Sequence, residues 1–230
     1  MPLDPGPTQW QLPMPGPTDG DLIAFGGDLA PATLLGAYRG GLFPMPTEPP
    51  RRGPWAPRRM EVGWWSPVER GVLPVHGLRI TRSLRRSVRR YQVTLDTAFA
   101  DVVAACADPR RDGAWIDEPM AAAYQQLFEL GWAHSVETWL DGVLVGGLYG
   151  VAIGGLFAGE SMFSHATDAS KVALVHLVGL LDDEYADRRL LDTQWQTEHL
   201  ASLGVVEIPR VEYYRRLSDA LTLPLPAAFG

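Results

Sequence analysis

The feature that most limits the fold of this chain is an uncharged run of 18 residues, Gly142 to Gly159, which ends directly before Glu160. Seven of its residues are glycine, and glycine costs about 1 kcal/mol per residue inside a helix. About 20 apolar residues suffice to cross a membrane, but the glycines and the Asp141-Gly142 hairpin signal favour neighbouring strands. The run therefore predicts a sheet meander that carries one carboxylate, Glu160.

The composition is that of an ordinary globular protein in a reducing compartment. Its 230 residues are 46% hydrophobic and 20% charged, which suffices for a core without metal or disulfide staples. The single cysteine, Cys106, allows no intrachain disulfide, and no Cys/His spacing suggests a metal site. No basic segment followed by an apolar one opens the chain, so a signal peptide is not expected. These features predict a cytoplasmic protein.

Turn signals and periodicity give a coarse order of elements. The first 20 residues contain six prolines and should lack regular structure. A helix over 28–41 follows, and a loop rich in proline and arginine is expected over 44–57. Further helices are predicted over 81–91, 97–107, 117–131, 168–185, 197–204 and 211–221. Strands are predicted over 92–96, 133–140, 143–153, 154–164, 189–195 and 205–209. A meander followed by alternating strands and helices predicts an α+β fold, with helices packed on a sheet.

The segment RITRSLRRSVRR, from Arg79 to Arg90, holds six arginines and no acid in a chain of net charge −7. The net charge argues against a general coat for nucleic acid. Spacings of three and four residues nevertheless give one helix a positive surface. The arginines concerned are Arg82, Arg85, Arg86, Arg89 and Arg90. A solvated face is the plain alternative, but like charges on one helix repel, and we favour a phosphate-binding helix.

A carboxylate and a carboxamide lie two residues apart in the predicted strand LLDTQW. The two-residue period of a strand places Asp192 and Gln194 on one face, with Thr193 on the other. The pair can then converge on one substrate atom. The alternative is a strand edge whose polar face lies in water.

Glu160 is the third candidate. In a regular strand it shares a face with Met162, while Gly159 and Ser161 face the other way. The glycines before it favour a site, because glycine lets another backbone or a ligand come close. The alternative is a structural salt bridge from Glu160 to an arginine.

Several segments between Phe25 and Arg210 resemble those of the leucyl/phenylalanyl-tRNA–protein transferase family, and they occur in the same order. GESMFS with a downstream DxQ is the most specific part of the resemblance. The segments are FGGDLAPATLLGAYRGGLFP, WWSPVERGVLP, RSLRRSVRR, AHSVETW, LVGGLYGVAIGGLFAGESMFS, ASKVAL, LLDTQ and HLASLGVVEIPR.

The resemblance implies an aminoacyltransferase. Such an enzyme moves leucine or phenylalanine, less readily methionine, from aminoacyl-tRNA to the N-terminal Arg or Lys of a protein, which marks that protein for N-end-rule degradation. The resemblance implies a Pro-rich segment and small domain over 1–60, and a catalytic domain over 61–230 that includes the arginine helix. The catalytic domain should be a mixed sheet like that of the GNAT acetyltransferases. No cofactor and no membrane are implied, and the expected form is a monomer.

Family positions carry over to this chain residue by residue. Asp192 and Gln194 match the catalytic pair, and Arg82 to Arg90 match the tRNA-binding helix. The aminoacyl pocket is expected to comprise Met45, Trp115, Leu148, Phe157, Glu160, Met162 and Leu191. Two positions depart from the pattern, because Met45 stands where the family often has Trp and Ala114 where it often has Thr. Methionine is flexible enough to line an apolar pocket. The preference between leucine and phenylalanine, and the group that moves the proton, stay open.

Two other functions are alternatives to the transferase. A GNAT acetyltransferase using acetyl-CoA needs a pyrophosphate loop, and RRDGAW fails that pattern at its last position. A non-catalytic RNA-binding protein explains the arginine helix, but it has no use for a DxQ pair beside a pocket.

Overall fold

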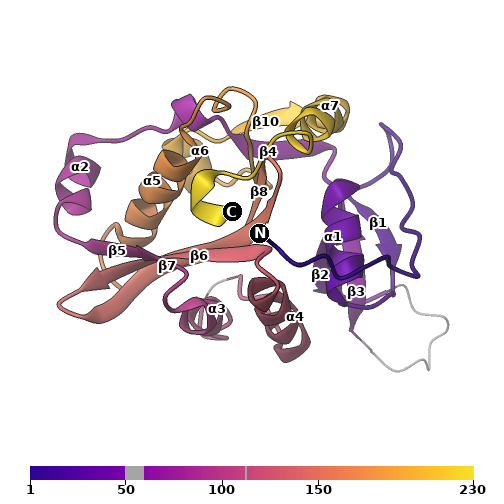
Figure 1. The fold of residues 1–230 in the computed structure, drawn as a ribbon, viewed down its shortest axis with the longest axis horizontal. Helices are drawn as coiled ribbons and strands as arrows, with labels where there is room; N and C mark the ends of the chain where they lie inside the picture. Colours follow the sequence, from indigo (N-terminus) through magenta and orange to yellow (C-terminus); the bar gives the residue numbers. More distant parts are fainter. Residues whose placement is uncertain (50–59, 112) are drawn as a thin grey trace.

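The computed structural model describes residues 1–49, 60–111 and 113–230. These form two sheets, one of three strands in the order β1-β3-β2 and one of seven in the order β10-β4-β9-β8-β7-β6-β5. Helices cover the large sheet on both faces, and the small sheet lies at one end of it (Figure 1). The predicted α+β class is therefore confirmed.

The small N-terminal sheet is all antiparallel. Its strands are β1 (Leu22–Phe25), β2 (Phe43–Thr47) and β3 (Glu61–Trp65). The first helix, α1 (Pro31–Arg39), lies between β1 and β2, begins with proline and ends at Gly40. The small sheet thus extends past residue 60, where the sequence placed a domain boundary. The loop predicted over 44–57 is wrong at its start, because β2 continues to Thr47. Residues 50–57 lie outside the described part of the chain.

The large sheet contains the predicted meander. Its strands are β4 (Glu69–Leu73), β5 (Gln92–Leu95), β6 (Ala133–Leu140), β7 (Val143–Ile153), β8 (Leu156–Ser164), β9 (Leu190–Gln194) and β10 (Val206–Pro209). The uncharged run forms β7 and the first part of β8, as predicted. No helix in the described part of the chain is long and apolar enough to cross a membrane.

One pair of strands in the large sheet is parallel. Leu156, Phe157 and Ala158 of β8 pair with 190–192 of β9, whereas the other neighbours in this sheet are antiparallel. The parallel pairing stops after Ala158, although β8 continues to Ser164 and β9 to Gln194. The sheet therefore parts between these two strands beyond that point.

Helices cover the sheet in two layers. They are α2 (Arg82–Val88), α3 (Phe99–Cys106), α4 (Glu118–Glu129), α5 (Ala169–Leu181), α6 (Glu198–Leu203) and α7 (Arg210–Ala220). Figure 1 shows α2, α5 and α6 on one face and α3 and α4 on the other. Because strand side chains alternate, neighbours such as Leu190 and Leu191 enter different cores. All these helices begin or end within a few residues of the predicted ranges.

The glycines of the uncharged run make room for neighbouring backbone. A Cβ on Gly146 would lie 2.5 Å from Cβ of Ala169, at the start of α5. A Cβ on Gly150 would lie 2.3 Å from the carbonyl oxygen of Ala158 on β8. Both distances are shorter than any ordinary contact, so these two glycines are needed for packing rather than for ligand access.

Candidate functional site

A cavity of about 420 Å³ opens where β8 and β9 part. Its walls come from β7, β8, β9, α5 and the start of α6. Apolar residues contributed by these elements are Leu148, Met162, Leu174, Leu177, Leu191 and Leu200. The polar residues are Arg111, Tyr149, Glu160, Ser161, Thr193, Gln194, Thr197 and His199. A mostly apolar cavity with a few placed polar groups is the usual form of a small-molecule site.

Glu160 reaches the cavity through a bulge in β8. Tyr149 pairs with Ser161 and Gly150 pairs with Gly159, so Glu160 is the extra residue between them. A bulge turns side chains away from strict alternation. Glu160 therefore points toward α1 and α4, whereas Met162 packs in the core under α5. The sequence-based prediction that these two side chains share a face is wrong for this reason.

Two tyrosines hold the Glu160 carboxylate. Tyr38 of α1 donates to Oε1 at 2.7 Å, and Tyr124 of α4 donates to Oε2 at 2.6 Å. Burial raises the pKa of Glu160 from 4.5 to about 7, and the tyrosine hydrogen bonds only partly oppose this shift. The alternative from sequence, a salt bridge from Glu160 to an arginine, is thus wrong, because two tyrosine hydroxyls donate to the carboxylate instead. Among the described residues that line this cavity, Glu160 is the one carboxylate.

Gln194 ends β9 in a left-handed conformation, with φ of 58°. This conformation is uncommon for a residue other than glycine. It breaks the alternation of the strand, so that Thr193 and Gln194 both line the cavity. Gly71 of β4 leaves the space for this bend, because a Cβ there would lie 2.7 Å from the carbonyl carbon of Trp195.

Asp192 does not line the cavity. Its side chain is fully buried and forms a two-bond ion pair with Arg70 of β4, with Nε–Oδ1 at 2.9 Å and Nη2–Oδ2 at 2.6 Å. Tyr213 of α7 donates to Oδ2 at 2.8 Å, and the backbone N–H of Gln194 donates to Oδ1 at 2.9 Å. The predicted convergence of Asp192 and Gln194 from one strand face is therefore wrong, because the bend at Gln194 separates the two side chains.

Buried polar atoms without a partner gather at this cavity. Five such side-chain atoms occur in the described part of the chain. Three of them, Tyr149 Oη, Thr193 Oγ1 and Gln194 Nε2, belong to residues that line the cavity. An unsatisfied buried donor costs about 1–3 kcal/mol. A ligand that accepts hydrogen bonds from these groups would recover that cost, so the arrangement is that of a binding site.

The structure brings together five of the predicted site residues at this cavity. They are Leu148, Glu160, Met162, Leu191 and Gln194. Met45 and Trp115 pack against the large core instead, and neither lines the cavity. Phe157 also lies outside, because its ring is buried 5.6 Å from the ring of Phe229.

Several cavity residues were missed in the sequence. Leu174 and Leu177 lie three residues apart on α5, a spacing that marks one helix face and could have been read. Tyr149 was hidden by alternation, which assigns it to the face opposite Leu148. Arg111 follows α3 and donates to the carbonyl oxygens of Cys106 and Met162, both at 2.5 Å. Nothing in the sequence near Arg111 signals that contact.

The predicted arginine helix is α2, together with the residues just after it. Arg82, Arg85, Arg86, Arg89 and Arg90 are all exposed. Its apolar side, centred on Leu84, packs near Ala169 and Val172 of α5. Figure 1 places α2 at the end of the sheet opposite the small N-terminal sheet. The positive surface therefore shares α5 as a neighbour with the cavity.

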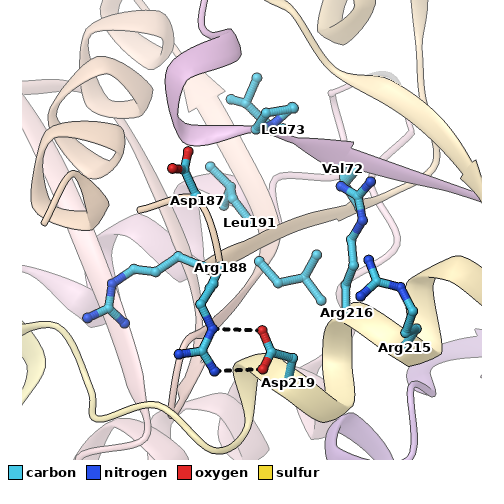
Figure 2. Close-up of a pocket in the computed structure, with 11 residues that line it drawn as sticks. Val72, Leu73, Asp187, Arg188, Leu191, Arg215, Arg216 and Asp219 are labelled. Atoms are coloured by element: carbon cyan, nitrogen blue, oxygen red, sulfur yellow. Dashed lines mark hydrogen bonds and ion pairs between the residues drawn. The ribbon is translucent and has the colours of Figure 1, made fainter. Parts of the chain in front are cut away.

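A second cavity, of about 320 Å³, lies near the start of β9 (Figure 2). Its charged groups already have partners. Arg188 donates to both oxygens of Asp219, at 2.9 and 2.6 Å, and Arg189 pairs with Asp183. Arg215 and Arg216 both pair with Glu212. Because these charges are compensated within the protein, we do not take this cavity as the functional site.

No metal centre is found in the part of the chain that the structure describes, where no three His, Cys, Asp or Glu side chains are grouped to hold an ion. The described residues of the site thus form an apolar cavity in a split sheet, with one carboxylate and several hydrogen-bonding groups that lack a partner.

Comparisons with known proteins identify the family to which this chain belongs. The family model "Leucyl/phenylalanyl-tRNA protein transferase" matches residues 72–218. A leucyl/phenylalanyl-tRNA–protein transferase of Aromatoleum aromaticum (strain DSM 19018 / LMG 30748 / EbN1) is 52% identical over 86% of this chain and 80% of that protein. One of Thiobacillus denitrificans (strain ATCC 25259 / T1) is 49% identical over 88% and 86%.

The chain belongs to the leucyl/phenylalanyl-tRNA–protein transferase family. A crystal structure of a conserved protein of unknown function from Bacteroides thetaiotaomicron VPI-5482 aligns with 68% of this chain and 56% of that chain. Its sequence identity is 13% and its TM-score 0.37, which is too low to assign a fold.

The Glu160 carboxylate makes the stability of the protein depend on pH. Its folded pKa of about 7 lies above the ordinary 4.5, so the folded state holds the proton more tightly than the unfolded state. The free energy of unfolding should therefore fall as pH rises from 4.5 to about 7. Glu160→Gln should remove this decline, as measured by urea unfolding across that interval.

Glu212→Gln is the matched control for this prediction. Glu212 is partly exposed to solvent, and hydrogen bonds from Arg215 and Arg216 lower its pKa from 4.5 to about 2. It is therefore ionised in both the folded and the unfolded state above about pH 6, and its replacement should leave the slope there as in the wild type. If the Glu160→Gln curve runs parallel to the wild-type curve, Glu160 does not titrate in this interval.

Proposed function

We propose that this protein transfers leucine or phenylalanine, less readily methionine, from aminoacyl-tRNA to the N-terminal Arg or Lys of acceptor proteins. The product carries a destabilising N-terminus for N-end-rule degradation. Membership of the family supports this function. The single observation that carries it is the apolar cavity in the split sheet, with unpartnered Tyr149, Thr193 and Gln194 on its wall.

The cavity suits an apolar amino-acid side chain. Leu148 and Leu191 are buried at its wall, and Leu174 and Leu177 close it from α5. A volume of about 420 Å³ falls within the usual range for small-molecule sites. Glu160 supplies one polar fixing point, and we assign it to the α-amino group of the donor amino acid. Aliphatic walls with a single carboxylate favour leucine and phenylalanine over polar side chains.

The reaction is aminolysis of an ester. The acceptor's amine nitrogen bonds to the ester carbon, and the bond from that carbon to the ribose oxygen breaks. The proton lost by the amine ends on the freed ribose hydroxyl. An α-amino group has a pKa of about 7.7–8.0, so a useful fraction is already neutral near neutral pH. The aminoacyl ester is already activated, so its aminolysis runs downhill without ATP. Placing amine and ester together lowers the barrier by up to about 7–11 kcal/mol.

Gln194 is the residue we assign to the reacting centre. Its Nε2 is buried in the cavity wall without a partner, as is Oγ1 of the neighbouring Thr193. Two such donors are suited to the oxyanion that forms when the amine attacks the ester carbon. Asp192 has its oxygens occupied by Arg70, Tyr213 and the Gln194 backbone. Its role is therefore to hold Gln194 rather than to accept the proton.

The remaining parts of the proposal concern the fold and the partners. The parting of parallel β8 and β9 at the cavity supports a GNAT-like arrangement of the large sheet, from β4 to β10. The exposed arginines of α2 support binding of tRNA phosphates there. A monomer in the cytoplasm, acting without a cofactor, completes the proposal. The rival acetyltransferase needs acetyl-CoA, and the rival RNA-binding protein does not use the cavity.

One reaction mixture tests the proposed function. The pure protein is incubated with labelled Leu-tRNA and a peptide that begins with Arg, without ATP or CoA. Label should pass to the peptide, and a peptide that begins with Asp should receive none. Transfer of acetyl groups from acetyl-CoA, with no transfer from Leu-tRNA, would show that the protein is an acetyltransferase instead.

The arginines of α2 should govern the dependence of tRNA affinity on salt. About three to four phosphate contacts give a slope near −3 in a plot of log K against log salt concentration. Replacing Arg82, Arg85, Arg86 and Arg89 by Gln should flatten this slope and raise KM for aminoacyl-tRNA, while KM for the peptide stays constant.

Arg215→Gln with Arg216→Gln is the control for charge alone. Both residues lie on α7 and pair with Glu212, so this variant should keep the wild-type slope. If both variants flatten the slope equally, loss of positive charge anywhere on the protein weakens tRNA binding, and α2 is not the tRNA-binding helix.

Leu148 should set the size of the aminoacyl side chain. It is buried and lines the cavity, so Leu148→Phe fills space that phenylalanine needs. One methylene in such a pocket is worth about 1–3 kcal/mol. The variant should lose more kcat/KM with Phe-tRNA than with Leu-tRNA. Phe157→Leu, outside the cavity, should change both substrates alike, and equal losses from Leu148→Phe would place Leu148 outside the aminoacyl site.

A further inference from the structure

We infer that Arg70 is a positioning residue for the transfer reaction, which it serves by fixing Asp192 and, through Asp192, the backbone of Gln194. This inference rests on the proposed function, because it concerns the same cavity. Arg70 itself is 1% exposed and does not line that cavity. Arg70 therefore does not touch a bound substrate, and its geometry acts through the residues that it holds.

The guanidinium of Arg70 is held by hydrogen bonds along its edge and by aromatic rings against its faces. Its edge meets both oxygens of Asp192, and Nη1 donates to the carbonyl oxygen of Gly41 at 3.2 Å. Its carbon lies 4.8 Å from the ring centre of Phe43 and 4.4 Å from that of Tyr213. A planar group that donates along its edge and stacks on aromatic rings cannot be replaced by a lysine ammonium.

The contacts of Arg70 join three parts of the fold. Gly41 and Phe43 belong to the turn after α1 and to β2, in the small N-terminal sheet region. Asp192 lies on β9 and Tyr213 on α7. The N-terminal region thus reaches the strand that carries Gln194 through Arg70, and it also reaches Trp195, whose ring lies 5.0 Å from that of Phe43 and 5.8 Å from that of Trp65. Arg70 is therefore one route by which a structural change in this region would pass to the reacting centre.

Asp192 passes this constraint to Gln194. Its Oδ1 accepts the backbone N–H two residues later, at 2.9 Å. A bond of this kind is typical of aspartate in turns and stabilises the bend of the chain. Here it accompanies the φ of 58° at Gln194. Since Arg70 also holds Oδ1, at 2.9 Å, the position of the guanidinium determines where the turn can form.

Arg70→Lys tests the inference by separating turnover from binding. The variant keeps a positive charge but loses the two-bond geometry. We expect kcat to fall about 100-fold, the size of loss that a displacement of about 1 Å at a reacting centre can cause. KM for aminoacyl-tRNA should stay unchanged, because Arg70 does not line the cavity.

Arg189→Lys is the matched control. Arg189 is another buried arginine in a two-bond pair, with Asp183, and it donates to the carbonyl oxygen of Pro224 at 3.1 Å. Its contacts do not include Gln194. Both lysine variants should lower Tm, but Arg189→Lys should keep the wild-type kcat at temperatures where it is folded.

A double variant shows whether Arg70 acts through Gln194. Arg70→Lys added to Gln194→Ala should lower kcat no further than Gln194→Ala alone, since residues that act as one unit are not additive. If the losses in kcat from the two substitutions multiply, the residues act independently and the inference is overturned. A folded Arg70→Lys protein with wild-type kcat would also overturn it. Absence of transfer by the wild type would refute the proposed function itself.

A milder pair of variants decides the question if Arg70→Lys does not fold. Tyr213→Phe keeps the ring that stacks on Arg70 and removes one hydrogen bond to Asp192. It should lower kcat about tenfold, the effect of one hydrogen bond to a charged group. Tyr214→Phe, whose hydroxyl lies 3.4 Å from that of Ser66, should keep the wild-type kcat. Equal kcat in the two variants would overturn the inference.

Discussion

The arrangement of the site depends on one buried ion pair, Arg70 with Asp192. Breaking such a pair by removing one partner costs about 3–5 kcal/mol, because the remaining charge is left without compensation. The pair is stabilised by Tyr213, by the Gly41 carbonyl and by stacking on Phe43. This network joins the N-terminal region to β9. Its consequence is local, since Asp192 holds the one backbone N–H that accompanies the left-handed turn at Gln194.

The second constraint is the bulge that carries Glu160. It lies on β8, across the gap from the bend at Gln194 on β9. Both strands are regular where they pair and irregular where they part. Bulges and strained residues are commonly concentrated at functional sites. In this protein the two irregularities turn Glu160 and Gln194 out of regular alternation, and both residues contribute to the cavity wall.

The sequence predicted the elements of the large sheet better than the orientation of its side chains. Periodicity located β5 to β10 and the helices, because those segments alternate or repeat as buried elements do. It missed all three strands of the small sheet. In β2 the prolines suggest a loop, but they are tolerated on the edge strand of a sheet. It also missed β4, in which Arg70 looks like a surface charge. The two-residue period placed Asp192 beside Gln194, and Glu160 beside Met162. Both placements fail, because a bulge and a left-handed residue leave no signal in residue type. The uncharged run and the DxQ spacing first marked these residues as candidates, and the resemblance to the family then favoured them as a site.

A crystal structure of the Arg70→Lys variant tests most directly whether the ion pair fixes Gln194. The account predicts that the backbone of Gln194 changes from the left-handed conformation, with φ of 58°, to one with negative φ. The side chain of Gln194 should then withdraw from the cavity. The strands β7 and β8 should stay in place, so that Leu148 and Glu160 still line the wall. An unchanged Gln194, still in the left-handed conformation and still in the cavity without the two-bond contact to Asp192, would contradict the account.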